Sequence, residues 1–144
     1  WSDTDGKVDI FVAAIGTGGT ISGTAKYLKE QNHDIKVIGV EPESSPLLTK
    51  GVAGAHKIQG IGANFVPDTL NRSFIDEIVT VSDDSAYEYT RLVAKSEGCL
   101  VGISSGAALA AACNIALRAE NKGKNIVVIL PDSGSRYLSS GVFE

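Results

Sequence analysis

Residues 8–20 read Val-Asp-Ile-Phe-Val-Ala-Ala-Ile-Gly-Thr-Gly-Gly-Thr, an apolar run that ends in a cluster of glycines. An apolar, β-branched run of this length is typical of a buried strand, and the glycines after it indicate a tight turn. Ile21, Ala25 and Leu28 then recur at the spacing of a helix. We expect the side chain of Thr20 to cap that helix. The segment therefore predicts a strand, a glycine loop and a helix.

The rest of the chain continues this alternation of strands and helices. Residues 35–40 form the next predicted strand, so the first forty residues make a β-α-β unit, whose strands are expected to be parallel and whose crossover is expected to be right-handed. Further elements are predicted at residues 75–81 (strand), 82–96 (helix), 104–119 (helix) and 125–130 (strand). The pattern indicates an α/β fold, a doubly wound, mainly parallel sheet with helices on both faces. Ligands of such sheets bind at the carboxyl ends of the strands.

Composition narrows the classes of function. The 144 residues suffice for one domain, 43% of them are hydrophobic, and the formal net charge is −4. Nucleic-acid binders carry a basic surface, and the excess of acidic over basic residues argues against that function. No apolar run approaches the length that a membrane-spanning helix needs. Two isolated cysteines make neither a disulfide framework nor a zinc site, and we expect no bound metal. Without a secretory signal, the expected location is the cytoplasm.

The glycine loop is the strongest candidate for a binding site. Its successive backbone N–H groups can form a concave nest, and the helix after it presents a positive N-terminus. Glycines let a ligand approach the backbone closely, while threonine hydroxyls add hydrogen bonds. The loop therefore predicts a phosphate site, formed by Gly16, Thr17, Gly18, Gly19 and Thr20.

Two other interpretations of the loop stay open at this point. A glycine-rich turn can serve only to pack a strand against a helix. A dinucleotide-binding module is the second, because Gly16 and Gly18 fit its fingerprint and Glu41 ends the next strand where a ribose-binding acid would lie. However, Ile21 occupies the position of the third glycine. A P-loop is excluded, because no Gly-Lys-Ser/Thr follows.

Five segments, taken in order, resemble the C-terminal half of cysteine synthase (O-acetylserine sulfhydrylase), a member of the fold-type-II pyridoxal-phosphate enzymes. They are residues 15–24 (IGTGGTISGT), 38–42 (IGVEP), 56–62 (HKIQGIG), 101–107 (VGISSGA) and 131–139 (PDSGSRYLS). Other members of the group, such as cystathionine β-synthase and serine dehydratase, share the glycine loop and stay open as alternatives. The resemblance implies pyridoxal 5'-phosphate as cofactor and a β-replacement that converts O-acetylserine and sulfide to cysteine and acetate.

The resemblance also implies roles for particular residues. The glycine loop would hold the cofactor phosphate, and Ser133 would hydrogen-bond the pyridine nitrogen. A neutral hydroxyl at that nitrogen leaves the ring a weaker electron sink than a carboxylate does, which suits β-elimination. The substrate side of the cleft would be lined by Gln59, Gly60, Ile61 and Gly62.

Polar residues near these segments are given structural roles. Asp132 is expected to face solvent or cap the backbone, and His56 to lie at the edge of the cleft without acting as a base. Ser104 and Ser105 are expected to cap the helix that follows them.

The resemblance covers no segment of the family's N-terminal half. That half carries the Schiff-base lysine and the loop that grips the substrate carboxylate, so no catalytic residue is assigned in this chain, and Lys57 does not replace the lysine. We expect residues 1–144 to be the C-terminal α/β cofactor-phosphate-binding domain, inactive alone. The partners implied are the N-terminal half of the enzyme, a second copy in a homodimer and the C-terminal tail of serine acetyltransferase. A catalytically silent domain that acts only as a binding partner is a further alternative.

Overall fold

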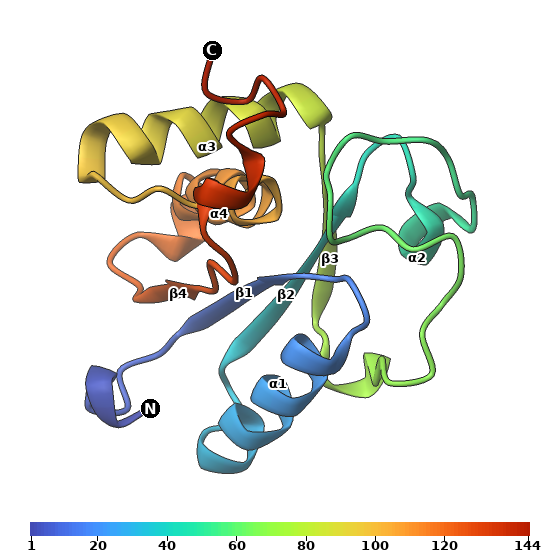
Figure 1. The fold of residues 1–144 in the computed structure, drawn as a ribbon. Coiled ribbons are helices and arrows are strands. Elements are labelled where there is room, and N and C mark those ends of the chain that lie inside the picture. The colour runs from blue at the N-terminus through green and yellow to red at the C-terminus, as the bar shows by residue number, and fades with distance from the viewer.

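Four parallel strands form a single sheet in the computed structural model, which describes residues 1–144 (Figure 1). Their order across the sheet is β3-β2-β1-β4. The strands are β1 (Ile10–Ala14), β2 (Lys36–Pro42), β3 (Glu77–Val81) and β4 (Ile126–Val128). Ile10 of β1 lies opposite Lys36 on one side and Ile126 on the other, so β1 is central. The α/β fold with a parallel sheet is confirmed.

Helices cover both faces of the sheet, as a doubly wound fold requires. Figure 1 shows α1 (Gly19–Gln31) on one face and α3 (Asp83–Glu97) with α4 (Ile103–Ala116) on the other. A single-turn helix, α2 (Leu47–Lys50), lies beside β3. Short 3₁₀ turns occupy Ser2–Thr4, Arg72–Phe74, Ala119–Asn121 and Gly134–Tyr137. None of these helices combines the length and apolarity needed to span a bilayer.

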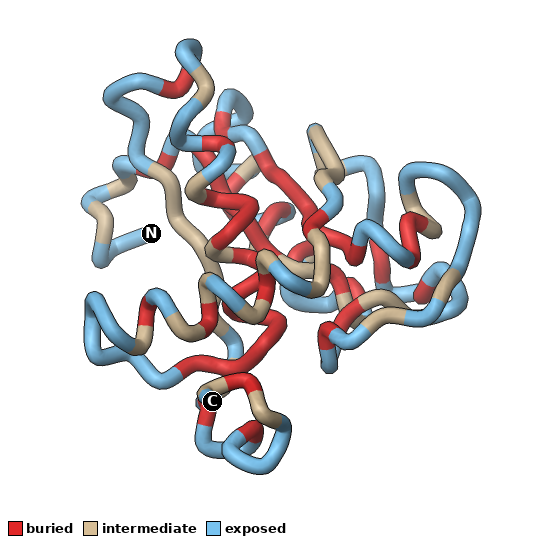
Figure 2. Tube along the Cα trace, turned by 90° about the horizontal axis from the view of Figure 1, so that it is seen from above, coloured by how far each residue is buried: buried red, intermediate tan, exposed pale blue.

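The sheet separates two apolar clusters. Side chains of β1 alternate between them, so that Ile10 and Val12 pack towards α4 while Phe11 and Ala13 pack towards α1. All four are at most 1% exposed, and Figure 2 shows the buried backbone running through the middle of the molecule. A strand buried on both faces needs apolar residues at every position, which explains the uninterrupted run in the sequence.

The ends of the helices differ from the predictions at the sheet's carboxyl edge. α3 lies within one residue of the predicted helix at 82–96, with the Ser82 hydroxyl accepting from the Ser85 N–H and with Gly98 in a left-handed conformation. α1, by contrast, has Gly18 as its N-cap, and no side chain caps it, so the prediction for Thr20 is wrong. The predicted capping of α4 by Ser104 or Ser105 is also wrong, because α4 begins at Ile103 and has no side-chain cap.

Candidate functional site

A row of unpaired backbone donors follows β1. None of the N–H groups of residues 16–21 donates a hydrogen bond within the chain. The first bond of α1 is the one from the Ser22 N–H to the Gly18 carbonyl, at 3.0 Å. Gly18 has a φ of 84°, a left-handed conformation that turns the chain directly into the 13-residue helix. Free amides beside the positive end of a helix are the groups that bind anions in proteins, so this loop is the candidate site.

The long irregular segment between β2 and β3 packs against this loop. The Gly62 N–H donates to the Ile15 carbonyl at 3.2 Å, and the Thr69 hydroxyl donates to the Thr17 carbonyl. A Cβ atom on Gly16 would overlap the carbonyl oxygen of Gly60, so the two backbones meet without side chains between them. The segment therefore forms one wall of the site.

Four segments distant in sequence meet at one cavity of about 180 Å³. The glycine loop supplies one side, Gly60 and Ile61 supply another, and Ser104 and Pro131 close it. These segments follow β1, follow β2, begin α4 and follow β4, which places the cavity at the carboxyl edge of the sheet. The cavity thus lies where a sheet of this kind binds its ligands.

Ser104 is the one hydroxyl that α4 contributes to the cavity. It is 5% exposed, and its Oγ makes no hydrogen bond within the chain. A hydroxyl so placed can donate to or accept from a bound ligand. Ser104 was predicted to cap the helix, although its segment belongs to the resemblance. The missed signal was the position of this segment at the same edge of the sheet as the glycine loop.

Ser133 does not line this cavity. Its side chain is exposed, and its Oγ lies 3.1 Å from the Ser135 Oγ and accepts from the Ser135 N–H at 3.3 Å. Ser133 pairs through its backbone with Val101, at the turn beyond Pro131. The Ser133 hydroxyl thus lies outside the lining of this cavity, and its contact with the pyridine nitrogen stays a prediction.

Asp132 is neither solvent-facing nor a backbone cap, contrary to the prediction. Its carboxylate accepts from the Tyr137 hydroxyl at 2.6 Å and from the Ser105 hydroxyl at 3.4 Å. The hydrogen bond to Asp132, together with burial and the nearby charge, raises the pKa of Tyr137. These contacts join the C-terminal turn to the first turn of α4.

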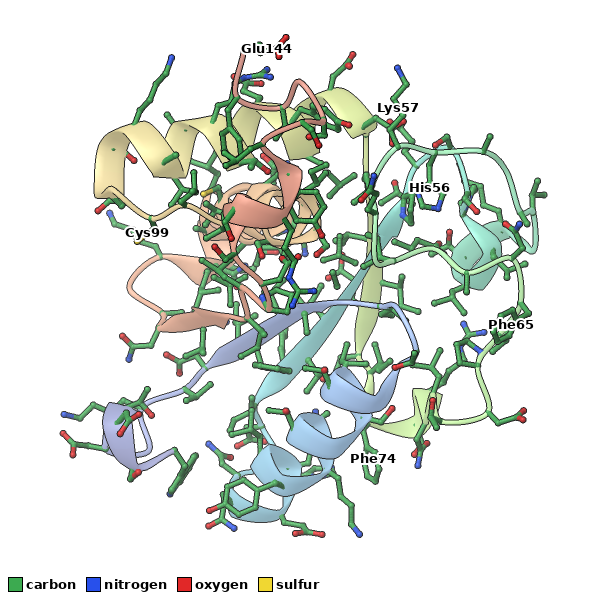
Figure 3. All side chains as sticks on the ribbon, viewed as in Figure 1. His56, Lys57, Phe65, Phe74, Cys99 and Glu144 are labelled. Atoms are coloured by element: carbon green, nitrogen blue, oxygen red, sulfur yellow. The ribbon has the colours of Figure 1, made fainter.

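Two further hollows adjoin the site, and three of the four predicted cleft residues line them or the 180 Å³ cavity. A larger cavity of about 490 Å³ shares the Thr17 and Gly60 walls and extends to Phe65, which is 67% exposed and projects outward from the long loop in Figure 3. Gly62 lines a small pocket next to Gly16. Gln59 and Gly19 line none of these hollows, although Gly19 lies within the row of free amides.

Glu41 is committed to another task than ligand binding. It is 2% exposed, and its carboxylate accepts from the backbone N–H groups of Leu48 and Thr49 at 2.8 and 3.0 Å. The Thr49 hydroxyl adds a third hydrogen bond at 2.5 Å. A ribose would have to displace these partners, so the geometry argues against the dinucleotide-binding interpretation.

His56 holds the long loop in shape. Its Nε2–H donates to the Gly62 carbonyl at 3.0 Å, and Gly62 has a φ of 68°. Figure 3 shows His56 within the loop, on the strand side of it. This agrees with a structural position at the edge of the cleft. No group of three or more His, Cys, Asp or Glu side chains is arranged to hold a metal.

Comparison with known proteins gives a consistent result. Residues 1–132 match the family described as pyridoxal-phosphate dependent enzymes. The chain is 50% identical to a cysteine synthase of Buchnera aphidicola over an alignment of 151 residues, which covers 99% of this chain and 47% of that protein. A cysteine synthase of Staphylococcus aureus is 49% identical, with 96% and 45% covered.

Solved structures agree with the sequence matches. The crystal structure of a cysteine synthase from Entamoeba histolytica superposes with a TM-score of 0.97 at 48% identity, covering 99% of this chain and 42% of that one. An O-acetylserine-dependent cystathionine β-synthase from Helicobacter pylori gives a TM-score of 0.92 at 45% identity, with 99% and 46% covered. The chain thus spans less than half the length of these relatives.

Proposed function

Since the chain belongs to the pyridoxal-phosphate-dependent enzyme family, we propose that it is the cofactor-phosphate-binding part of a cysteine synthase. Its homology to cysteine synthases extends over nearly all of its residues. The observation that carries the proposal is the row of free amides at residues 16–21. The activity proposed for the assembled enzyme is the conversion of O-acetylserine and sulfide to cysteine and acetate.

The residues at the loop fit the phosphate of pyridoxal phosphate. A phosphate monoester is a dianion with strong acceptor oxygens, and the loop offers free N–H donors, the hydroxyls of Thr17 and Thr20 and a helix N-terminus. The bare Cα of Gly16 and the left-handed Gly18 leave the backbone open to close approach. When bound, the cofactor supplies an electron sink for the carbon that reacts.

We infer that the hydroxyl facing the cofactor ring is that of Ser104 rather than Ser133. Ser104 lines the same cavity as the glycine loop and has an unused Oγ, whereas the Ser133 hydroxyl is exposed and bonded to Ser135. A neutral hydroxyl at the ring nitrogen donates or accepts without fixing a proton there, so a contact from Ser104 would also leave the ring a weaker electron sink, which suits β-elimination.

The long loop between β2 and β3 is the proposed wall of the amino-acid side. Gly60 and Ile61 belong to both the 180 Å³ and the 490 Å³ cavities, so a substrate in the larger one would lie next to the ring. His56 positions this wall through Gly62 and transfers no proton in the proposal. The base that removes the α-proton is expected from the other half of the enzyme.

The first proposed partner is the part of the enzyme that the chain does not span. The N-terminal half would supply the Schiff-base lysine and the loop that grips the substrate carboxylate. A second copy in a homodimer and the tail of serine acetyltransferase are proposals from the resemblance alone. Residues 1–144 are thus proposed as one cofactor-phosphate-binding domain of a larger enzyme.

Titration of the ¹⁵N-labelled chain tests the anion site directly. Inorganic phosphate and pyridoxal phosphate should each shift the amide resonances of residues 16–21. The amides at the start of α3 serve as an internal control, because that helix has a similar length but is capped by Ser82. Shifts of equal size at both helices, or a stronger response to NAD than to pyridoxal phosphate, would contradict the proposal.

Activity tests the wider assignment. The chain alone should make no measurable cysteine from O-acetylserine and sulfide, and adding a cysteine synthase N-terminal half should produce activity. A normal rate from the chain alone would contradict the half-enzyme proposal. The similarity to the Helicobacter pylori protein keeps a cystathionine β-synthase as the second candidate, and it predicts a preference for a larger thiol over sulfide.

A further inference from the structure

A largely buried cluster of hydrogen bonds lies behind the first turn of α4. The carboxylate of Asp132 accepts from the Tyr137 hydroxyl at 2.6 Å and from the Ser105 hydroxyl at 3.4 Å. Tyr137 is 9% exposed, and Ser105 is fully buried. Because buried hydroxyls that share one acceptor have no water to turn to, this cluster fixes one side of the turn.

The backbone of Asp132 holds the same turn. Gly102 is the N-cap residue of α4, and its N–H donates to the Asp132 carbonyl at 3.1 Å. A Cβ atom on Gly102 would overlap the Asp132 carboxylate, so this carboxylate lies directly against the start of the helix. No side chain within α4 caps that end. Asp132 therefore contacts the start of α4 through both its backbone and its side chain.

The neighbouring hydroxyl of Ser104 faces a different direction. A Cβ atom on Gly60 would lie 3.8 Å from the Ser104 Oγ, and Gly60 belongs to another wall of the 180 Å³ cavity. Successive side chains of a helix point about 100° apart. A turn that directs Ser105 towards Asp132 therefore also sets the direction in which Ser104 enters the cavity.

We propose that Asp132 is a positioning residue, whose contacts with Gly102 and Ser105 hold the first turn of α4 so that the Ser104 hydroxyl points at the cofactor ring. Tyr137 holds the carboxylate in place and lines none of the three cavities at the site. Asp132 itself acts through its hydrogen bonds and touches no ligand. This inference rests on the proposed function, because it takes the ring of pyridoxal phosphate as the occupant of the cavity.

Two phosphate monoesters separate the ring contact from the phosphate contact. Pyridoxine 5'-phosphate carries the ring nitrogen without the reactive aldehyde, whereas benzyl phosphate has no ring nitrogen. Both are titrated into the ¹⁵N-labelled chain, and the shifts of the amides at residues 16–21 give the two dissociation constants. We call the constant for benzyl phosphate divided by that for pyridoxine phosphate the ring ratio. In the wild-type chain, the ring ratio should be greater than one.

Loss of the carboxylate should change the ring ratio and leave the affinity for benzyl phosphate unchanged. Ser104→Ala should lower the ratio about two- to tenfold, because one hydrogen bond to the ring nitrogen is lost. Asp132→Ala should lower it at least about twofold, because the first turn of α4 is then less firmly held. Asp132→Asn should retain the ratio, because the amide can accept from the Tyr137 hydroxyl and donate to the Ser105 hydroxyl.

A double variant tests whether Asp132 acts through Ser104. Asp132→Ala added to Ser104→Ala should lower the ring ratio no further, because the hydroxyl to be positioned is already absent. Ser82→Ala is the control for a general loss of stability. It removes the cap of α3, away from the cavity, so it should destabilise the chain and leave the ring ratio unchanged.

Any of five results would overturn the proposal. They are a wild-type chain without preference for pyridoxine phosphate, a ring ratio unchanged in Asp132→Ala, an equal fall in Asp132→Asn, a further fall in the double variant, or an equal fall in Ser82→Ala. A chain that binds neither ligand would refute the proposed function together with this inference. A chain that binds both ligands with a ring ratio insensitive to Asp132 would refute the inference and leave the phosphate site intact.

Discussion

Replacing Gly18 with alanine should destabilise the chain strongly, for two reasons that the structure separates. The residue has a φ of 84°, and a non-glycine residue in the left-handed region costs about 1–2 kcal/mol. The added Cβ would also lie 2.7 Å from the Cβ and 2.9 Å from the Cα of Leu70. Overlap of this kind in a packed interior costs about 1–3 kcal/mol. The expected loss is therefore roughly 2–5 kcal/mol, a large share of a total stability of about 5–15 kcal/mol.

A glycine five residues further along provides the matched control. Gly23 lies inside α1, is exposed, and a Cβ there would meet no atom within 4 Å. Gly23→Ala should therefore stabilise the chain by about 0.5–1 kcal/mol, because alanine restricts the unfolded chain more and favours the helix. The two variants carry the same chemical change in or beside one helix, so they should move stability in opposite directions.

Urea unfolding followed by far-ultraviolet circular dichroism measures both changes from the midpoint and the slope. An unchanged slope would show that the variants alter stability rather than the compactness of either state. If Gly18→Ala lost less than about 0.5 kcal/mol, the left-handed turn and its contact with Leu70 would be refuted. The same variant should weaken phosphate binding, because the turn aligns the free amides.

Three further predictions concern individual contacts. Ser82→Ala should cost about 1 kcal/mol in urea unfolding, because the variant removes the hydroxyl that caps α3; no change would contradict the cap. The hydrogen bond and charge of Arg118 lower the pKa of Glu77 in the fold. This ion pair should therefore stabilise the fold above about pH 4.5, and the stabilisation should be lost as the pH falls further. Glu77→Gln should remove this part of the dependence of stability on pH. Tyr137→Phe should cost about 1.5–3 kcal/mol by removing the hydrogen bond to Asp132. Because the pKa of Tyr137 is raised in the fold, the wild-type chain should keep this stabilisation below about pH 10 and lose it at higher pH, whereas the phenylalanine variant should show no such step.

Most of the fold follows from patterns that are local in the sequence. Buried strands are continuous apolar runs, and the limits of α3 follow from a serine cap and a glycine stop. The predicted strand at 125–130 is shorter in the structure, Ile126–Val128, which is the stretch in register with β1. Such an end depends on the neighbour that a strand finds, and no local pattern specifies it.

The candidate site was predicted less completely, because it depends on which loops meet. The glycine loop could be identified from the sequence, because glycines between a predicted strand and a predicted helix form a local pattern. The choice between Ser104 and Ser133 depends on the direction of two side chains, which a one-residue shift in a turn reverses. Asp132 illustrates the same limit: its partners, Tyr137 and Ser105, are set by the way the C-terminal turn folds back on α4.

The distribution of helix caps connects stability with the proposed binding. α1 and α4 both begin at the cavity and lack side-chain caps, whereas α3, which begins away from it, has the Ser82 cap. A cap is worth about 1 kcal/mol, so its absence at α1 leaves that helix end weaker in the free chain. A capping side chain would, however, occupy the amides that an anion needs. Bound phosphate should therefore supply the stability that a side-chain cap would have given to the start of α1. The midpoint of unfolding should rise with phosphate concentration in the wild-type chain, and it should rise less in Gly18→Ala.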